Sequence, residues 1–88
     1  MLRISIQKNS DKSIRLSVEG RLVGPWVEEL RQQSERALAE SQKVAIDLEK
    51  LLFVDSQGVS LLRQLAERKV AHLNCSTFIR QQLKETTQ

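Results

Sequence analysis

The stretch Val44-Ala45-Ile46-Asp47-Leu48, followed by Leu51-Leu52-Phe53-Val54-Asp55-Ser56-Gln57-Gly58, decides the fold of this 88-residue chain. The first run is short and mainly apolar, which is typical of a central strand buried on both faces of a parallel or mixed sheet. Residues 51–54 lead from it into Asp55, and apolar residues recur at helical spacing from Val59 to Ala66. We therefore expect a buried strand, followed by a helix that begins near Asp55.

Two alternating segments precede this unit. Residues 2–7 and 13–19 alternate apolar with polar side chains, and the polar stretch 8–12 separates them. A period of two is typical of half-buried strands, so we expect an antiparallel hairpin with one face on the core. Gly24-Pro25 predicts the start of a helix, because proline at the first helical position loses no hydrogen bond. The face that this helix would bury consists of Val27, Leu30, Ser34, Ala37, Leu38 and Ser41.

The C-terminal part continues the alternation of strands and helices. Val70 to Cys75 is predicted as a further strand, and Ser76 as the N-cap of a last amphipathic helix through Phe78, Ile79 and Leu83. The order is then β-β-α-β-α-β-α, an α/β fold with a small mixed β-sheet of about four strands and about three helices. No internal repeat or linker is visible, so residues 1–88 are expected to form one domain.

Composition excludes several classes of protein. Hydrophobic residues make up 40% and charged residues 28% of the chain, as in an ordinary globular domain. The longest apolar run, residues 51–54, is far short of the about 20 residues that span a bilayer, and no secretory leader is visible, so we expect a cytoplasmic protein. The net charge of +3 is spread along a chain without tyrosine, which argues against nucleic-acid binding.

Catalytic and metal-binding patterns are poor. His72 is the only histidine, and we expect it on the surface, on the same face as Asn74. Nothing in the spacing brings it to Ser56 as a base, and one histidine with the single Cys75 cannot hold a metal ion. The glycines are too widely separated for a phosphate-binding loop. We therefore expect neither an enzyme, nor a bound metal, nor a cofactor.

The composition of the segment Asp55-Ser56-Gln57-Gly58 indicates a role beyond packing. Asp55 is expected to cap the helix, and Gly58 to permit a close backbone approach. The positive helix end would also favour a phosphate on Ser56, although simple capping explains the same residues. Leu22-Val23 and Trp26 form an apolar cluster between the second strand and the first helix, which fits either an interaction patch or part of the core.

These residues resemble a known family. The runs 44–48 and 52–59, the following Leu61-Leu62 and the upstream Val18-Glu19-Gly20-Arg21-Leu22 look like the signature of STAS domains, the anti-sigma factor antagonist family. The resemblance implies a small cytoplasmic bacterial module that regulates transcription by binding an anti-sigma factor or related kinase around this loop. The candidate partner-binding residues are Arg21, Leu22, Trp26, Asp55, Ser56, Gln57, Gly58 and Leu62.

One position departs from the pattern of that family. The second hydroxyl residue of the loop is the phosphate acceptor in regulated members, and Gln57 stands there in this chain. An amide cannot accept a phosphoryl group, so the resemblance implies a loop that stays unphosphorylated, with Ser56 as the one possible phosphorylation site beside it.

Two other functions remain open at this point. The chain could be a STAS-like adaptor subunit that docks on a lipid-transport ATPase, which co-purification would reveal. It could also be a small phosphatase or nucleotide-binding protein, which calorimetry with nucleotides would test. A homodimer is a further possibility, because the early end of the chain after Leu83 would leave a sheet edge exposed.

Overall fold

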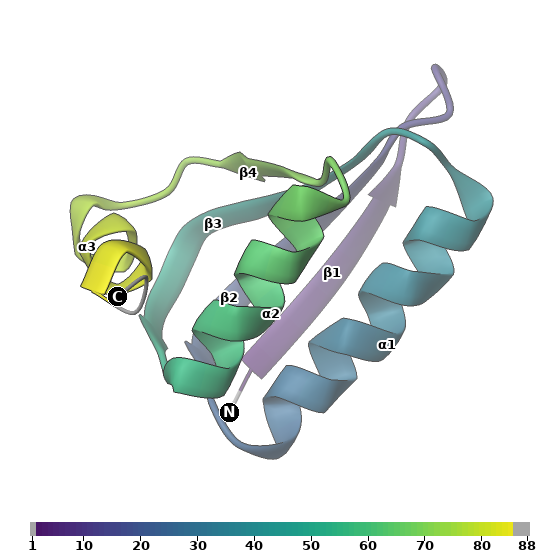
Figure 1. Ribbon diagram of the computed structural model, residues 1–88. Coiled ribbons are helices and arrows are strands. Elements are labelled where there is room, and N and C mark those ends of the chain that lie inside the picture. The colour runs from purple at the N-terminus through teal and green to yellow at the C-terminus, as the bar shows by residue number, and fades with distance from the viewer. Residues whose placement is uncertain (1, 86–88) are drawn as a thin grey trace.

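The computed structural model describes residues 2–85, which form a four-stranded sheet and three helices (Figure 1). In chain order the elements are β1 (Leu2–Lys8), β2 (Ile14–Leu22), α1 (Pro25–Glu40), β3 (Val44–Val54), α2 (Ser56–Glu67), β4 (Ala71–Leu73) and α3 (Thr77–Glu85). This is the predicted β-β-α-β-α-β-α order with a mixed sheet, so the expected fold class is confirmed.

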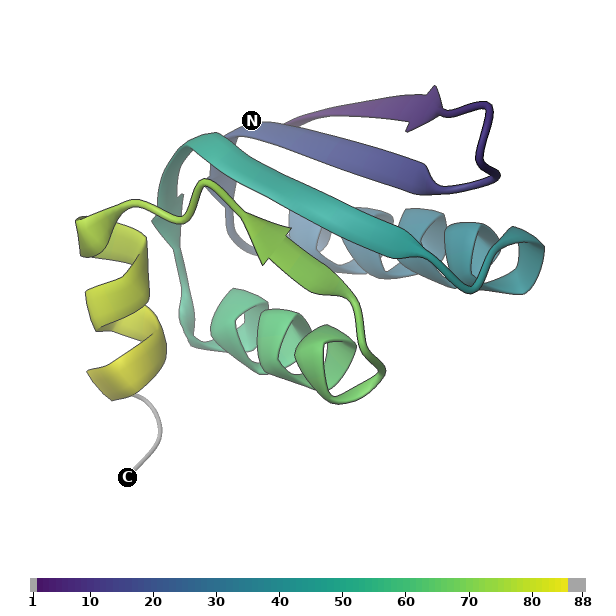
Figure 2. The same ribbon diagram turned by 90° about the horizontal axis from the view of Figure 1, so that it is seen from above.

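The sheet has the strand order β1-β2-β3-β4. β1 pairs antiparallel with β2, whereas β2 with β3 and β3 with β4 are parallel. Two consecutive crossovers thus move in the same direction across the sheet, and right-handed crossovers then place both helices on one face. Figure 2 shows this layering: α1 and α2 lie together under the sheet, and the opposite face is left uncovered.

The core fills the space between the sheet and the two crossover helices. Leu16 of β2 lies beside Ile46 of β3, and both side chains are fully buried. α1 contributes Leu30 and α2 contributes Leu62, which are equally inaccessible to water. Each such side chain stabilises the fold by about 1.5–3 kcal/mol through burial of apolar surface. The predicted amphipathic face of α1 is confirmed, since its Val27, Leu30, Ser34 and Ala37 are buried.

β3 departs from its prediction in two respects. Residues 44–48 were expected to be buried on both faces, but among them only Val44, Ile46 and Leu48 face the core, while Ala45 and Asp47 are partly exposed on the uncovered face. It also continues to Val54 instead of ending at Leu48. The pairing of β2 with β3 shifts register between Ser17 and Glu19 and again after Gly20. These β-bulges let the two strands stay hydrogen-bonded past Glu49 and Lys50, the polar residues that interrupt the apolar alternation of β3.

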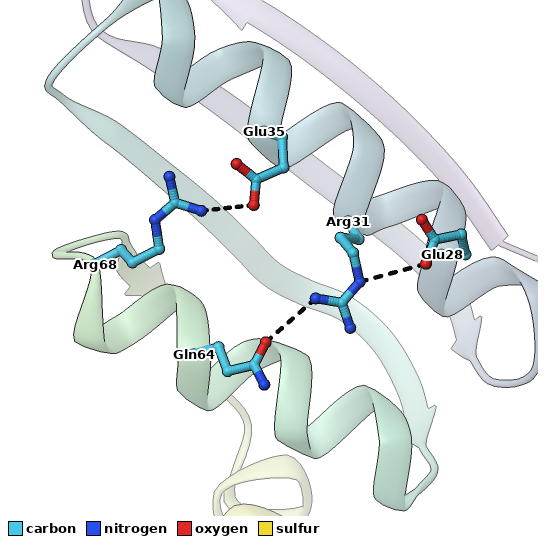
Figure 3. Close-up of polar contacts among 5 residues, drawn as sticks. All are labelled: Glu28, Arg31, Glu35, Gln64 and Arg68. Carbon is cyan, nitrogen blue, oxygen red and sulfur yellow. Dashed lines mark hydrogen bonds and ion pairs between the residues drawn. The ribbon is translucent and has the colours of Figure 1, made fainter.

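A row of polar contacts joins the outer sides of α1 and α2 (Figure 3). Arg68, which directly follows α2, places its Nη1 2.6 Å from Glu35 Oε2 of α1, and Arg31 Nη1 donates to Gln64 Oε1 at 3.2 Å. Arg31 also reaches back to Glu28, with 3.4 Å between Nε and Oε1. These side chains are exposed, so the row adds little free energy and mainly fixes how the two helices lie against each other.

Of the two C-terminal elements, the strand is shorter than predicted, and the helix begins as expected. β4 comprises three residues instead of the range 70–75, because Asn74 adopts a positive φ of 55° and turns the chain out of the sheet. The Ser76 hydroxyl then accepts a hydrogen bond from the Ile79 N–H at 3.1 Å, which confirms it as the cap of α3. α3 lies at the end of β3 (Figure 2), where Gln82 Nε2 donates to the carbonyl of Val54 at 3.1 Å.

Candidate functional site

The predicted loop lies at the carboxyl end of β3, where the strand turns directly into α2. Asp55 has an extended backbone with φ −86° and ψ −179°, and its Oδ1 accepts a hydrogen bond from the Gly58 N–H at 2.8 Å. This is the side-chain cap expected at a helix start, and it satisfies one of the free N–H groups of the first turn. No residue within that turn is acidic, so the Asp55 carboxylate is the charge that meets the positive end of the α2 dipole.

The same carboxylate ties a second loop to this one. Asp55 Oδ2 accepts a hydrogen bond from the Gly24 N–H at 3.0 Å, at the point where the chain enters α1. The Asp55 N–H in turn donates to the Leu22 carbonyl at 3.1 Å. Segments 22–24 and 54–58 are therefore held together by one side chain and one backbone group. The two parallel strands that end here supply the adjacency, since Leu22 and Val54 are partners in the sheet.

Gly58 allows the close approach that the sequence predicted. A Cβ at this position would lie 2.5 Å from Val54 Cγ2 and 2.9 Å from the Leu22 carbonyl oxygen. Both distances are shorter than van der Waals contact permits, so any side chain here would push the first turn of α2 away from the strand ends. The residue is buried, and its part in the site is to let the loop sit close to β2.

The exposed part of this corner is small and polar. Ser56 and Gln57 are exposed, Asp55 is half-buried, Arg21 is exposed at the end of β2, and Trp26 is half-buried against the core. We call Arg21, Asp55, Ser56 and Gln57 the helix-start surface, and Trp26 packs beside it. The structure brings segments 21–26 and 54–57 to one corner. Most of the Trp26 indole is covered there, so the apolar cluster predicted from the sequence serves chiefly in packing.

Two of the predicted contact residues belong to the interior. Leu22 and Leu62 each have 0% exposure, so the expectation that their side chains meet a partner is wrong. Leu22 ends β2 facing the core, and Leu62 lies on the side of α2 that covers the sheet. Their apolar character reflects the core and not an interface.

His72 also differs from its prediction. It is the sheet partner of the buried Ile46, so its imidazole lies on the helix-covered face, with Nε2 buried and without a hydrogen-bond partner among residues 2–85. Burial lowers the pKa of His72 below its ordinary value of 6.5, and a hydrogen bond with the Leu62 backbone offsets only part of this effect. The ring is thus held neutral under α2 and takes no part in the helix-start surface.

The described residues form no metal centre. Within residues 2–85 no three His, Cys, Asp or Glu side chains gather closely enough to hold a metal ion. No helix in that range has the length and apolar character required to cross a membrane. What the corner offers is backbone N–H groups, a hydroxyl, an amide and a guanidinium, which are groups suited to binding.

Comparison with known families agrees with this geometry. A family model described as "Mlab, STAS domain" matches residues 6–77, which include β2, β3 and the whole of α2. This chain belongs to the STAS domain family. The resemblance seen in the sequence is confirmed, and the loop 55–58 falls inside the matched part of the STAS domain.

Solved structures share the fold of this STAS domain. The anti-sigma factor antagonist SpoIIAA in its unphosphorylated form superposes with a TM-score of 0.75 at 20% identity, covering 93% of this chain and 82% of that one. The phosphorylated form of the Bacillus cell fate determinant SpoIIAA gives 0.69 at 22% identity, with coverages of 97% and 84%. An anti-sigma factor antagonist STAS domain from Rhodobacter sphaeroides gives 0.62 at 17%, with coverages of 84% and 87%. No curated protein sequence matches the chain.

The large apolar side chains that the STAS domain exposes were not predicted from the sequence. Leu52 is 68% and Phe53 39% exposed, next to the site in β3, and Phe78 at the start of α3 is 55% exposed. Phe53 is the sheet partner of Arg21, so it borders the helix-start surface. One signal was available: in the run 51–54, a strand cannot turn four consecutive apolar side chains toward a single core.

Proposed function

We propose that this STAS domain is a protein–protein interaction module that binds a regulatory partner through its helix-start surface, with the loop unphosphorylated at Gln57. The observation that carries this proposal is the exposure of Ser56 and Gln57 on a helix start that Asp55 and Gly58 hold in place. A rigid, exposed turn loses little conformational entropy when a partner binds. The STAS fold is typically that of a non-enzymatic regulatory module, and two solved relatives are anti-sigma factor antagonists by name.

The charge of the surface constrains the partner. Arg21 is exposed, the first turn of α2 carries no acidic residue, and both oxygens of the Asp55 carboxylate already accept backbone hydrogen bonds. The exposed Arg21 guanidinium favours a partner that presents acidic or neutral polar groups here. Phe53 beside Arg21 adds apolar area at the border of the contact. We therefore expect an anti-sigma factor or a related kinase with an acidic contact segment.

The test is affinity capture of the tagged chain's partners, with Gln57→Arg compared with Gln42→Arg. Both residues are exposed, but Gln42 lies between α1 and β3, at the opposite end of the sheet. Gln57→Arg should remove the captured partner, while Gln42→Arg, the same chemical change, should retain it. Circular dichroism of both variants checks that the fold is intact. Retention of the partner by a folded Gln57→Arg variant would place the contact elsewhere.

The phosphorylation state is tested separately. The captured kinase is incubated with the chain and ATP, and the products are analysed by mass spectrometry. No phosphate is expected on residues 55–58, because the amide of Gln57 cannot accept one. A stoichiometric phosphate on Ser56 would replace the unphosphorylated module by a switched one.

The presence of Gln57, where regulated members of the family have a hydroxyl residue, also supports a second function. Gln57 removes the acceptor that a kinase-controlled antagonist would use, and the matching family model bears the name Mlab and not that of an antagonist. An adaptor subunit that docks on a lipid-transport ATPase through the same surface needs no acceptor. Capture of an ATPase instead of an anti-sigma factor would favour this second function.

A further inference from the structure

The outer edge of β1 is open along the whole length of the strand. β1 stands at one end of the strand order, and its seven residues pair with β2 from Leu2 opposite Gly20 to Lys8 opposite Ile14 without interruption. Within residues 2–85 no strand lies on its other side. β4, at the opposite edge, has only three residues. The edge that can accept another strand is thus β1, and not the C-terminal edge that the sequence suggested.

This edge lacks the usual protection against pairing. Isolated edges are commonly blunted by proline, a bulge or an inward-pointing charge, and β1 has none of these within Leu2–Gln7. Its one charge on the helix-covered face, Lys8, stands at the strand end and is paired with Glu40 of α1 at 3.0 Å. The sequence of β1 therefore leaves its backbone groups available along most of the strand.

The helix-covered side of the same edge is apolar and incompletely filled. Ile4 and Ile6 are the sheet partners of the buried Val18 and Leu16, so they point toward the helices, yet Ile6 is 50% exposed. A groove of about 160 Å³ runs between this strand and α1, with Ile6 and Ala37 among its lining residues. Apolar surface in such a groove gains free energy when a second apolar strand covers it.

We propose that two copies of this chain pair through β1, antiparallel, with Ser5 of one copy opposite Ser5 of the other. This register pairs all seven residues of the strand with their symmetric counterparts. It places Ile4 opposite Ile6 of the second copy on the helix-covered face, and Arg3 opposite the neutral Gln7 on the uncovered face. Like charges do not meet, and a two-fold axis perpendicular to the sheet keeps both α1 helices on one face.

The dimer leaves the helix-start surface free. That surface lies at the ends of β2 and β3, with Asp55 following β3, and β2 separates β3 from the β1 edge. The eight-stranded sheet would present two copies of the surface, so a partner with two contact segments would gain from both. The dimer itself does not depend on the proposed partner, and its failure would leave that proposal intact.

The first test is the oligomeric state measured by analytical ultracentrifugation over a wide concentration range. We expect a dimer of twice 10.1 kDa in equilibrium with monomer. Ile6→Lys would bury an ammonium group opposite Ile4 of the second copy, and it should raise the dissociation constant at least about tenfold. Phe78→Lys is the matched control, since Phe78 is also a half-exposed hydrophobic residue but lies in α3, which packs on β3 and α2 and not on β1. It should leave the dissociation constant unchanged.

The second test reads the register directly and does not depend on the stability of the Ile6 variant. In a Cys75→Ser background, Ser5→Cys should form an intermolecular disulfide on mild oxidation, because directly opposed residues lie within disulfide distance. Arg3→Cys should not, because its own copy would lie four residues away along the strand, about 13 Å. A monomer at every concentration, a dimer insensitive to Ile6→Lys, or equal cross-linking at both positions would each overturn the proposal.

Discussion

Replacing Gly58 with alanine tests the close approach between α2 and the strand ends. The added Cβ would meet the Leu22 carbonyl oxygen at 2.9 Å and Val54 Cγ2 at 2.5 Å, so the first turn of α2 must move outward. Overpacking of this kind costs about 1–3 kcal/mol. Movement also strains the hydrogen bond from the Asp55 N–H to Leu22, worth about 1 kcal/mol. Alanine returns about 1 kcal/mol as the better helix former, so the net loss is about 2 kcal/mol.

Urea unfolding, monitored by circular dichroism, measures this loss of free energy. In a domain of this size a loss of about 2 kcal/mol lowers the Tm by about 8–16 °C. The control is Ser60, an exposed residue of the same helix, changed to glycine and to alanine. At position 60 alanine should be the more stable of the two by about 1 kcal/mol, from helix propensity alone. At position 58 the order should reverse. A Gly58→Ala variant that is as stable as the parent, or more stable, would refute the steric argument.

Three further predictions concern single side chains. Asp55→Ala removes the acceptor of both the Gly58 and the Gly24 N–H groups and should lower the free energy of unfolding by about 2 kcal/mol, with Asp55→Asn in between; equal losses for both variants in urea would contradict this. Trp26→Ala should lower it by about 2–3 kcal/mol through lost packing, with partner capture unchanged; loss of the partner without loss of stability would make Trp26 a contact residue. Burial lowers the pKa of His72 in the folded state, so the unfolded state binds the proton first as the pH falls. The free energy of unfolding should therefore decrease below about pH 6.5, by up to about 1.4 kcal/mol per pH unit. Urea unfolding curves measured over a pH series should show this decrease for the parent chain, and a much smaller one for His72→Gln.

The elements that the sequence predicted well are those with a local cause. Pro25 and Ser76 mark the starts of α1 and α3, and Asp55 caps α2, because capping depends on a few neighbouring residues. The register of the hairpin also follows from its alternation of apolar and polar residues. The position of the candidate site at the carboxyl end of β3 follows from these elements, and the structure places it there.

The predictions were wrong where contacts between distant parts of the chain determine whether a side chain is buried. His72 was assigned to the surface because an alternating strand places it on the same face as the polar Asn74, but the buried Val70 and the pairing with Ile46 place its ring under α2. Leu22 looked like part of an interaction patch because the sequence cannot show that β2 ends against the first turn of α2. Such outcomes depend on which strands become neighbours, and local patterns do not contain that information.

The bridge from the Asp55 carboxylate to the Gly24 N–H has a practical consequence. Trp26, the only tryptophan of a chain without tyrosine, stands two residues beyond that bridge, so near-ultraviolet excitation reaches a single indole beside the corner that Ser56 occupies. A ligand that strains the bridge on one side shifts the surroundings of the ring on the other. The protein thus carries a built-in fluorophore whose emission can follow docking in real time, without a dye or an introduced label.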